Sequence, residues 1–261
     1  MRSSAASDVY KRQEEYVRDQ FPGRDFFIAA RADLTRAAGG REINGVYLGR
    51  DGYLLEKWLD SDFDPEQLMR NIEAVNRFSG QHDTDKVSVM IVPTSGFVLH
   101  DKLPENAPMF DQNTAFKMML DNISAKAEFI DTRELMLNHR DEYIFYKTDH
   151  HWTSRGAFLA YSHWRGENGE SVSEGEFKIE EATNSFKGSL YSKTLLSSCP
   201  ADKIELYTEA VPTDYTVYYN FGREVSHSVY ALDNLQKRDK YQVFLDGNHP
   251  EATIQTGNEN G

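Results

Sequence analysis

A short apolar run at residues 87–93, VSVMIVP, constrains the fold more than any other part of the sequence. It is nearly continuous and rich in β-branched residues, which is typical of a strand buried on both faces. A helical pattern follows at residues 113–125, and a second short strand pattern follows at residues 128–131. Because a strand, a helix and a strand in this order predict a parallel crossover, we place the middle of the chain in the α/β class.

Further helices and strands are predicted on both sides of this unit. At residues 64–80, Asp64 is a good helix cap and Pro65 suits the first turn of a helix. The other expected elements are helices at residues 28–38, 132–140 and 154–164, a hairpin at residues 45–55, and a third strand at residues 143–146. The alternation predicts one α/β domain built around a parallel sheet.

The two ends of the sequence differ in character from its middle. Residues 1–13, MRSSAASDVYKRQ, resemble a translated adapter and are interpreted as a non-native tail. Residues 14–261 are interpreted as a single, incomplete domain. From about residue 167 to residue 245, polar loops and β-prone runs replace the alternation, which predicts a β-rich insertion. The chain stops in a polar turn of the kind that precedes a strand, so we expect a further strand beyond Gly261.

Composition excludes several functional classes. The formal net charge of −13 argues against a nucleic-acid or anionic-membrane surface, because such surfaces need clustered Lys and Arg. Cys199 is the one cysteine, so neither a disulfide framework nor a thiolate metal cluster is available. No apolar run is long enough to span a bilayer, and a membrane anchor or export signal is expected only in a missing N-terminus.

The sequence YKTDHHWTSRGAFLAY at residues 146–161 carries the most chemical information. It lies where a predicted strand ends and a helix begins, the edge of an α/β sheet at which ligands bind. In extended backbone, Asp149 and His151 would share one face, while His150 and Trp152 would point the other way. A carboxylate bonded to Nδ1 of His151 would orient an imidazole base. The same residues are also compatible with a helix cap followed by surface histidines.

Asp149-His150-His151-Trp152, followed by Thr153, resembles the signature of the DHHW family, relatives of the alginate O-acetyltransferases. The resemblance covers roughly residues 14–261. It also rests on the segments at residues 49–54, 89–103 and 188–192. It implies an SGNH-hydrolase-like fold, that is, a flavodoxin-like three-layer sandwich with a parallel sheet.

The resemblance further implies acyl transfer by a Ser-His-Asp triad, with Asp149 and His151 as catalytic residues and His150 and Trp152 beside them. The serine is expected after Gly261, and Ser95 is the best internal alternative. Gly247 and Asn248 are candidates for oxyanion or substrate contacts. The implied enzyme is an O-acetyltransferase or acetylesterase that acts on a cell-envelope or extracellular polysaccharide, outside the cytoplasm or at a membrane. No cofactor and no metal are expected, and the acyl donor stays open.

Two other classes compete with acyl transfer. Asp-His-His also opens the metal motif of the DHH phosphoesterases, but such a site needs further acidic ligands from earlier strand ends. The first strand, VSVMIVPTSG, ends without an acid. A catalytically silent carbohydrate-binding module is the other alternative, since the chain is rich in Tyr and Phe.

Overall fold

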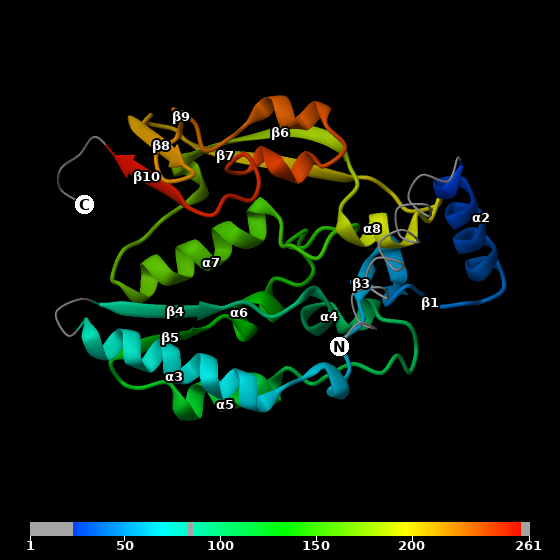
Figure 1. The fold of residues 1–261 in the computed structure, drawn as a ribbon, viewed down its shortest axis with the longest axis horizontal. Coiled ribbons are helices and arrows are strands. Elements are labelled where there is room, and N and C mark those ends of the chain that lie inside the picture. The colour runs from blue at the N-terminus through cyan, green and yellow to red at the C-terminus, as the bar shows by residue number, and fades with distance from the viewer. Residues whose placement is uncertain (1–22, 83–85, 257–261) are drawn as a thin grey trace, which may run out of the picture.

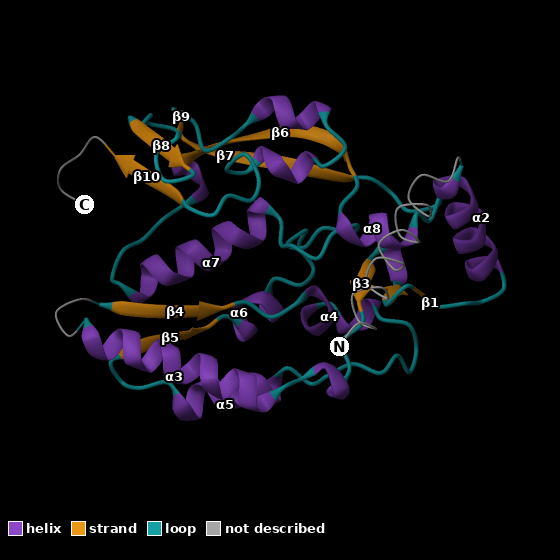
Figure 2. Cartoon of the chain, viewed as in Figure 1, coloured by secondary structure: helices purple, strands orange, loops and turns teal. Residues whose placement is uncertain are grey.

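The structure is a computed structural model that describes residues 23–82 and 86–256 (Figure 1). The adapter-like tail at residues 1–13 lies outside the described residues, and so does the polar turn at residues 256–261 except for Thr256, the last residue of β10. Helices and strands are both spread along the chain (Figure 2). The helices are α2 (Arg24–Ala37), α3 (Pro65–Gln81), α4 (Ser95–Val98), α5 (Asn113–Asn122), α6 (Arg133–Asn138), α7 (Ser154–Glu167) and α8 (Ser189–Thr194). The strands are β1 (Glu42–Ile43), β2 (Val46–Leu48), β3 (Leu54–Glu56), β4 (Val87–Ile91), β5 (Ala127–Asp131), β6 (Phe177–Phe186), β7 (Asp202–Glu209), β8 (Tyr215–Tyr219), β9 (Glu224–Ser226) and β10 (Ala252–Thr256).

The predicted parallel crossover is confirmed. Strands β4 and β5 pair in parallel, with Val87 opposite Ala127, and α5 precedes β5 along the chain. Helix α3 begins as expected, because Asp64 accepts a hydrogen bond from the N–H of Gln67 (2.9 Å). Its buried Ile72 packs with Phe116 and Met119 of α5 in a small apolar core. In Figure 1, α3 and α5 cover one side of β4 and β5, and α7 lies between these strands and the β6–β7 pair.

The third strand predicted at Tyr143–Tyr146 is absent, because only Phe145 in this stretch pairs with another strand-like residue, in an isolated bridge to Trp152. Within the described residues the parallel sheet therefore has two strands, β4 and β5. Residues of β4 are half-buried or exposed and do not form a strand that is buried on both faces. The fold is mixed α/β with small parallel and antiparallel sheets; a flavodoxin-like three-layer sandwich is not confirmed.

The second half of the chain is antiparallel. Strands β6 and β7 pair over their whole length, with irregular register near Thr183, and β8 lies between β9 and β10. Phe186 of β6 and Ile204 and Leu206 of β7 pack with Tyr146 and Val243 in a separate core. The limits of the β-rich insertion, residues 167–245, stay a prediction. Strand β10, which follows residue 245, pairs with β8, which precedes it.

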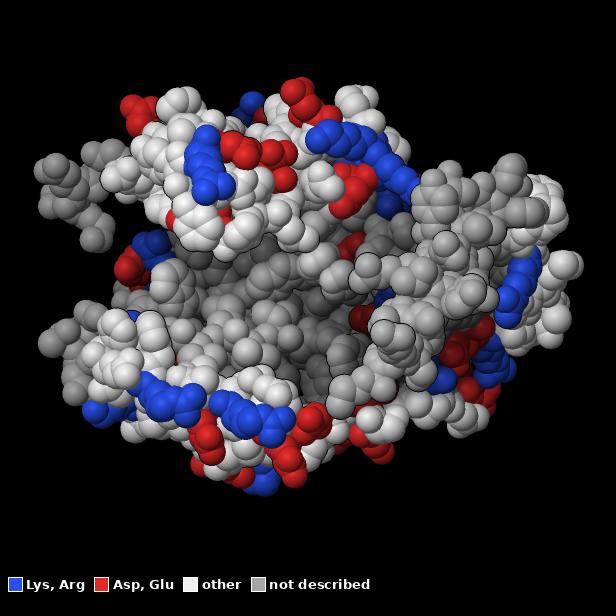
Figure 3. Space-filling view, viewed as in Figure 1, with Lys and Arg blue, Asp and Glu red and all other residues white. Residues whose placement is uncertain are grey.

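The predicted hairpin is confirmed as β2 and β3, to which β1 adds a third strand. The N–H of Leu54 donates to the carbonyl of Lys147 (2.7 Å), which ties the hairpin to the segment that precedes Asp149. Figure 3 shows this face of the molecule hollowed between the β6–β10 part and the α3–α5 part, with charges of both signs on the two rims. Among the described residues, no helix combines the length and the apolar character that crossing a bilayer requires.

Candidate active site

Residues 146–151 form a tight turn between the bridged residues Phe145 and Trp152. The N–H of Tyr146 donates to the carbonyl of His151 (3.3 Å). Inside the turn, Oδ1 of Asp149 accepts the backbone N–H of His151 (2.9 Å) and lies 2.5 Å from its Nδ1. An aspartate that binds the N–H two residues further on makes an Asx turn. The predicted contact between Asp149 and His151 is confirmed, and a turn produces it where we had expected extended backbone.

The carboxylate of Asp149 is almost fully buried, at 3% exposed. Burial opposes its ionisation, but the hydrogen bonds from His151 and from the backbone N–H of Ser189 (2.6 Å) outweigh burial. Together these contacts hold the pKa of Asp149 well below its usual range. The carboxylate is therefore ionised at neutral pH and can stabilise a positive charge on His151.

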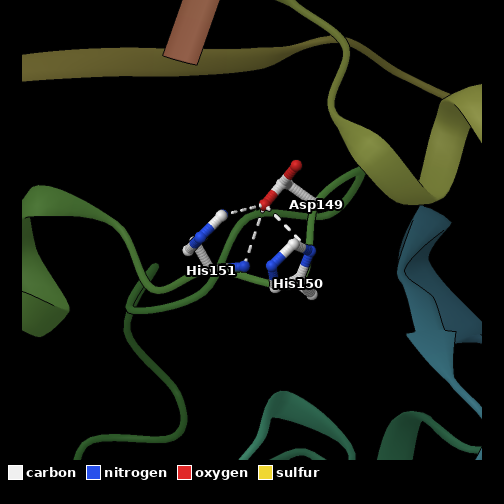
Figure 4. A group of neighbouring side chains, drawn as sticks. All are labelled: Asp149, His150 and His151. Carbon is white, nitrogen blue, oxygen red and sulfur yellow. Dashed lines mark hydrogen bonds and ion pairs between the residues drawn. The ribbon is translucent and has the colours of Figure 1, made fainter. Parts of the chain in front are cut away.

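His150 does not point away from this pair, contrary to the prediction from extended backbone. Its ring lies 3.9 Å from the ring of His151, and its Nδ1 lies 3.7 Å from Oδ1 of Asp149 (Figure 4). The same Nδ1 lies 2.7 Å from the hydroxyl of Ser189. The cause is the bend at residues 147–151, which brings consecutive side chains to one side. We call Asp149, His150 and His151 the Asp-His-His cluster.

Tyr241 stacks on His151, with 4.2 Å between the ring centroids and 12° between the ring planes. It lies in a short 3₁₀ helix at Lys240–Val243. Burial and the negative charge of Asp149 raise the pKa of Tyr241 to about 12, so its ring is a neutral phenol at physiological pH. The stacked ring restricts the plane of the imidazole. Sequence reasoning missed this residue.

A buried acid, Asp202, binds the turn through hydrogen bonds. Asp202, at the start of β7, accepts the backbone N–H groups of Lys147 (2.9 Å) and Thr148 (2.8 Å). It also accepts the hydroxyls of Thr148 (2.5 Å) and Tyr143. The hydroxyl oxygen of Thr148 in turn accepts the N–H of Gly188 (2.9 Å). These bonds fasten the turn to β7 and to the start of α8, and no local signal in the sequence indicated them.

A cavity of about 600 Å³ opens beside the turn. The Asp-His-His cluster lines it, together with Ser189, Tyr241 and Asn248. Because Nδ1 of His151 is engaged by Asp149, Nε2 is the ring nitrogen that remains for a reacting group. The arrangement is an oriented, partly exposed imidazole backed by a buried carboxylate, which is suited to general base catalysis.

Comparison with known proteins decides the family. The model of the family described as "DHHW protein" matches residues 72–259, which include the whole turn. The chain belongs to the DHHW family. No curated protein matches the sequence.

The chain is also similar to several solved structures. A DHHW family protein from Eubacterium siraeum is 22% identical, with a TM-score of 0.67, over 84% of this chain and 73% of that chain. PatB1 from Bacillus cereus, solved with a sulfonyl adduct, is 19% identical, with a TM-score of 0.65, over 84% of this chain and 76% of that chain. The O-acetyltransferase domain of Pseudomonas putida AlgJ is 25% identical, with a TM-score of 0.48, over 63% of this chain and 64% of that chain.

The other candidate site residues of this DHHW protein differ in their position relative to the cavity. Asn248 lines the cavity, but Gly247 does not, and its N–H donates to the carbonyl of Phe244 (3.1 Å). The N–H of Gly247 is thus engaged within the protein, and a contact of Gly247 or Asn248 with an oxyanion stays a prediction. Ser95 is buried at the start of α4 and is not part of the cavity lining. Trp152 packs against the apolar core beside the turn.

The Asp-His-His cluster could also hold a cation. It offers three ligand atoms within 4.8 Å of one another, and no other group of this kind occurs in the part of the chain that the structure describes. Two of the three side chains bond to each other, and His150 bonds to Ser189. A phosphoesterase site for two cations needs additional acidic ligands, and the described residues do not add them to this cluster. The geometry therefore favours a hydrogen-bonded base over a two-metal centre.

Proposed function

We propose that this protein is an acyl-transfer enzyme, an O-acetyltransferase or acetylesterase, in which His151 is the general base and Asp149 orients it. The observation that carries the proposal is the buried, ionised carboxylate of Asp149 bonded to Nδ1 of His151 at 2.5 Å. That contact leaves Nε2 available at the wall of the cavity. Such a pair takes a proton from a hydroxyl nucleophile and then carries the positive charge.

In the proposed reaction, Nε2 of His151 removes the proton of a serine hydroxyl as its oxygen attacks the acyl carbonyl. The leaving group then receives that proton from His151. The carboxylate of Asp149 keeps the imidazole in one tautomer and stabilises its charged form. Tyr241, stacked on the ring, limits its rotation. None of these steps requires a cofactor.

The identity of the serine is part of the proposal. Among the described residues, no hydroxyl forms a hydrogen bond with His151, and the hydroxyl of Ser189 is bonded to His150. Ser95 is not at the cavity. The DHHW resemblance favours a serine that follows Gly261. It also favours a polysaccharide acceptor and a location outside the cytoplasm, which we propose on that ground alone.

Labelling with a sulfonyl fluoride tests the function, because such reagents trap activated serine hydroxyls. The full-length protein is treated with phenylmethanesulfonyl fluoride, and the modified peptide is identified by mass spectrometry. We expect one labelled serine, and we expect His151→Ala to slow labelling by about 100-fold or more. His163→Ala serves as the matched control, since His163 lies on α7 and is not part of the cavity lining.

Two results would contradict the proposal: no labelled serine in the wild type, or labelling at the same rate in His151→Ala. A label on Ser95 would identify the nucleophile as the first residue of α4 and would exclude a serine after Gly261. A label on a residue after Gly261 would establish the expected one.

A further inference from the structure

His150 is a second imidazole at the same cavity, and the proposed reaction does not use it. Its side chain is 48% exposed, and its Nδ1 lies 2.7 Å from the hydroxyl of Ser189. No residue in the described ranges, 23–82 and 86–256, bonds to its Nε2, although His150 is part of the cavity wall. One ring nitrogen is thus held by the protein while the other is available to a ligand.

Ser189 contacts two members of the Asp-His-His cluster, Asp149 and His150. Its backbone N–H donates to Oδ2 of Asp149 (2.6 Å), and its side chain contacts His150. The rings of His150 and His151 are 3.9 Å apart and tilted by 35°. A group bound to Nε2 of His150 would therefore lie beside the imidazole that acts as base. This is the place at which the second substrate of an acyl transfer has to arrive.

An acyl-enzyme can react with water or with the hydroxyl of an acceptor. In transfer, the acceptor oxygen forms a new ester bond to the acyl carbon, and the bond between that carbon and the serine oxygen breaks. The acceptor proton passes to Nε2 of His151 and then to the serine oxygen. Because His151 serves water and acceptor equally, a preference for the acceptor needs another group that binds it.

We propose that His150, held by Ser189, binds the acceptor hydroxyl and so favours transfer over hydrolysis. The inference rests on the proposed function. His150 makes a hydrogen bond to the acceptor oxygen through Nε2 and does not change its own protonation state in the reaction. Ser189 is a positioning residue that acts through His150. The acceptor class is a polyhydroxylated compound such as a carbohydrate.

The ratio of transfer to hydrolysis tests this role. The full-length protein receives p-nitrophenyl acetate as donor, with glycerol or cellotetraose as acceptor. The burst of p-nitrophenol reports acylation, and mass spectrometry compares acetylated acceptor with free acetate. We expect His150→Ala to lower the ratio about tenfold, the effect of losing one hydrogen bond, and to slow the burst by less than about threefold.

Ser189→Ala is expected to lower the ratio as well, and Ser189→Thr to restore it, because threonine keeps the hydroxyl that holds His150. His163→Ala controls for the loss of an imidazole elsewhere. A purely structural role of His150 would change the burst and leave the ratio unaltered.

The outcomes separate the two proposals. A wild type without an acyl-enzyme contradicts the proposed function itself. A wild type that forms the acyl-enzyme but transfers to neither acceptor overturns only the role of His150. Equal ratios in wild type and His150→Ala overturn it too.

Discussion

Replacement of Gly188 by alanine would displace the carboxylate of Asp149 without changing either histidine. A Cβ atom at Gly188 would lie 2.3 Å from Oδ2 of Asp149 and 2.4 Å from its Cβ. Ordinary van der Waals contact begins at 3.4 Å, so Asp149 would have to move by about 1 Å. The Cβ contact involves an atom next to the backbone, which a rotation of the carboxylate cannot relieve.

A misplacement of about 1 Å at a catalytic group can lower the rate about 100-fold. Overpacking of this kind also destabilises a protein by about 1–3 kcal/mol. We therefore expect Gly188→Ala to lower kcat/KM for p-nitrophenyl acetate in the full-length protein by about 100-fold. Urea unfolding should show a loss of stability within that range.

Gly80→Ala is the matched control, because a Cβ atom at Gly80 in α3 meets no atom within 4 Å. It should leave kcat/KM unchanged and stability equal or higher by up to about 1 kcal/mol. If Gly188→Ala keeps both wild-type kcat/KM and wild-type stability, the packing of Gly188 against Asp149 does not position the carboxylate.

Three further outcomes follow from the same contacts. Asp202→Ala leaves four donors, two of them buried and two partly buried, without their acceptor, and should lower the free energy of unfolding by about 3 kcal/mol or more in urea titration; a loss below about 1 kcal/mol would contradict that network. Because the folded-state pKa of Asp149 is depressed, its stabilising effect is complete above the unfolded value of about 3.9 and is lost as pH falls toward the folded pKa. The stability difference between wild type and Asp149→Asn should therefore shrink below about pH 4, and a difference that grows there would be inconsistent with this sign. Chelation with EDTA should leave folding and ester cleavage unchanged, whereas loss of activity restored by manganese would favour the phosphoesterase alternative.

Periodicity and capping allowed prediction of the elements whose determinants are local. Helix α3 was predicted from the cap at Asp64 and from its apolar spacing, β4 from its β-branched composition, and β5 from a short strand pattern after a predicted helix. Residues 143–146 have the β-prone composition of a strand, but in the structure they lead into the turn at residues 146–151. Phe145 bridges Trp152 only seven residues later, and a sequence pattern of four residues does not contain that closure.

The candidate site was only partly predictable for the same reason. The two-residue spacing of Asp149 and His151 was sufficient to predict their contact, although the backbone conformation we assumed was wrong. The orientation of His150 depends on the Asx turn and on Ser189. Tyr241 and Asp202 reach the site from distant segments through packing and buried hydrogen bonds, and their positions leave no local pattern in the sequence.

The rate of acyl-enzyme formation in the full-length protein measures the role of His151 most directly. We expect His151→Ala to lower the burst rate with p-nitrophenyl acetate by about 10³-fold or more, since it removes the base. His150→Ala should lower the same rate far less, because His150 contacts Ser189 and not the nucleophile. An equal and large loss of the burst in both variants, or an unchanged burst in His151→Ala, would contradict the assignment of His151 as the general base.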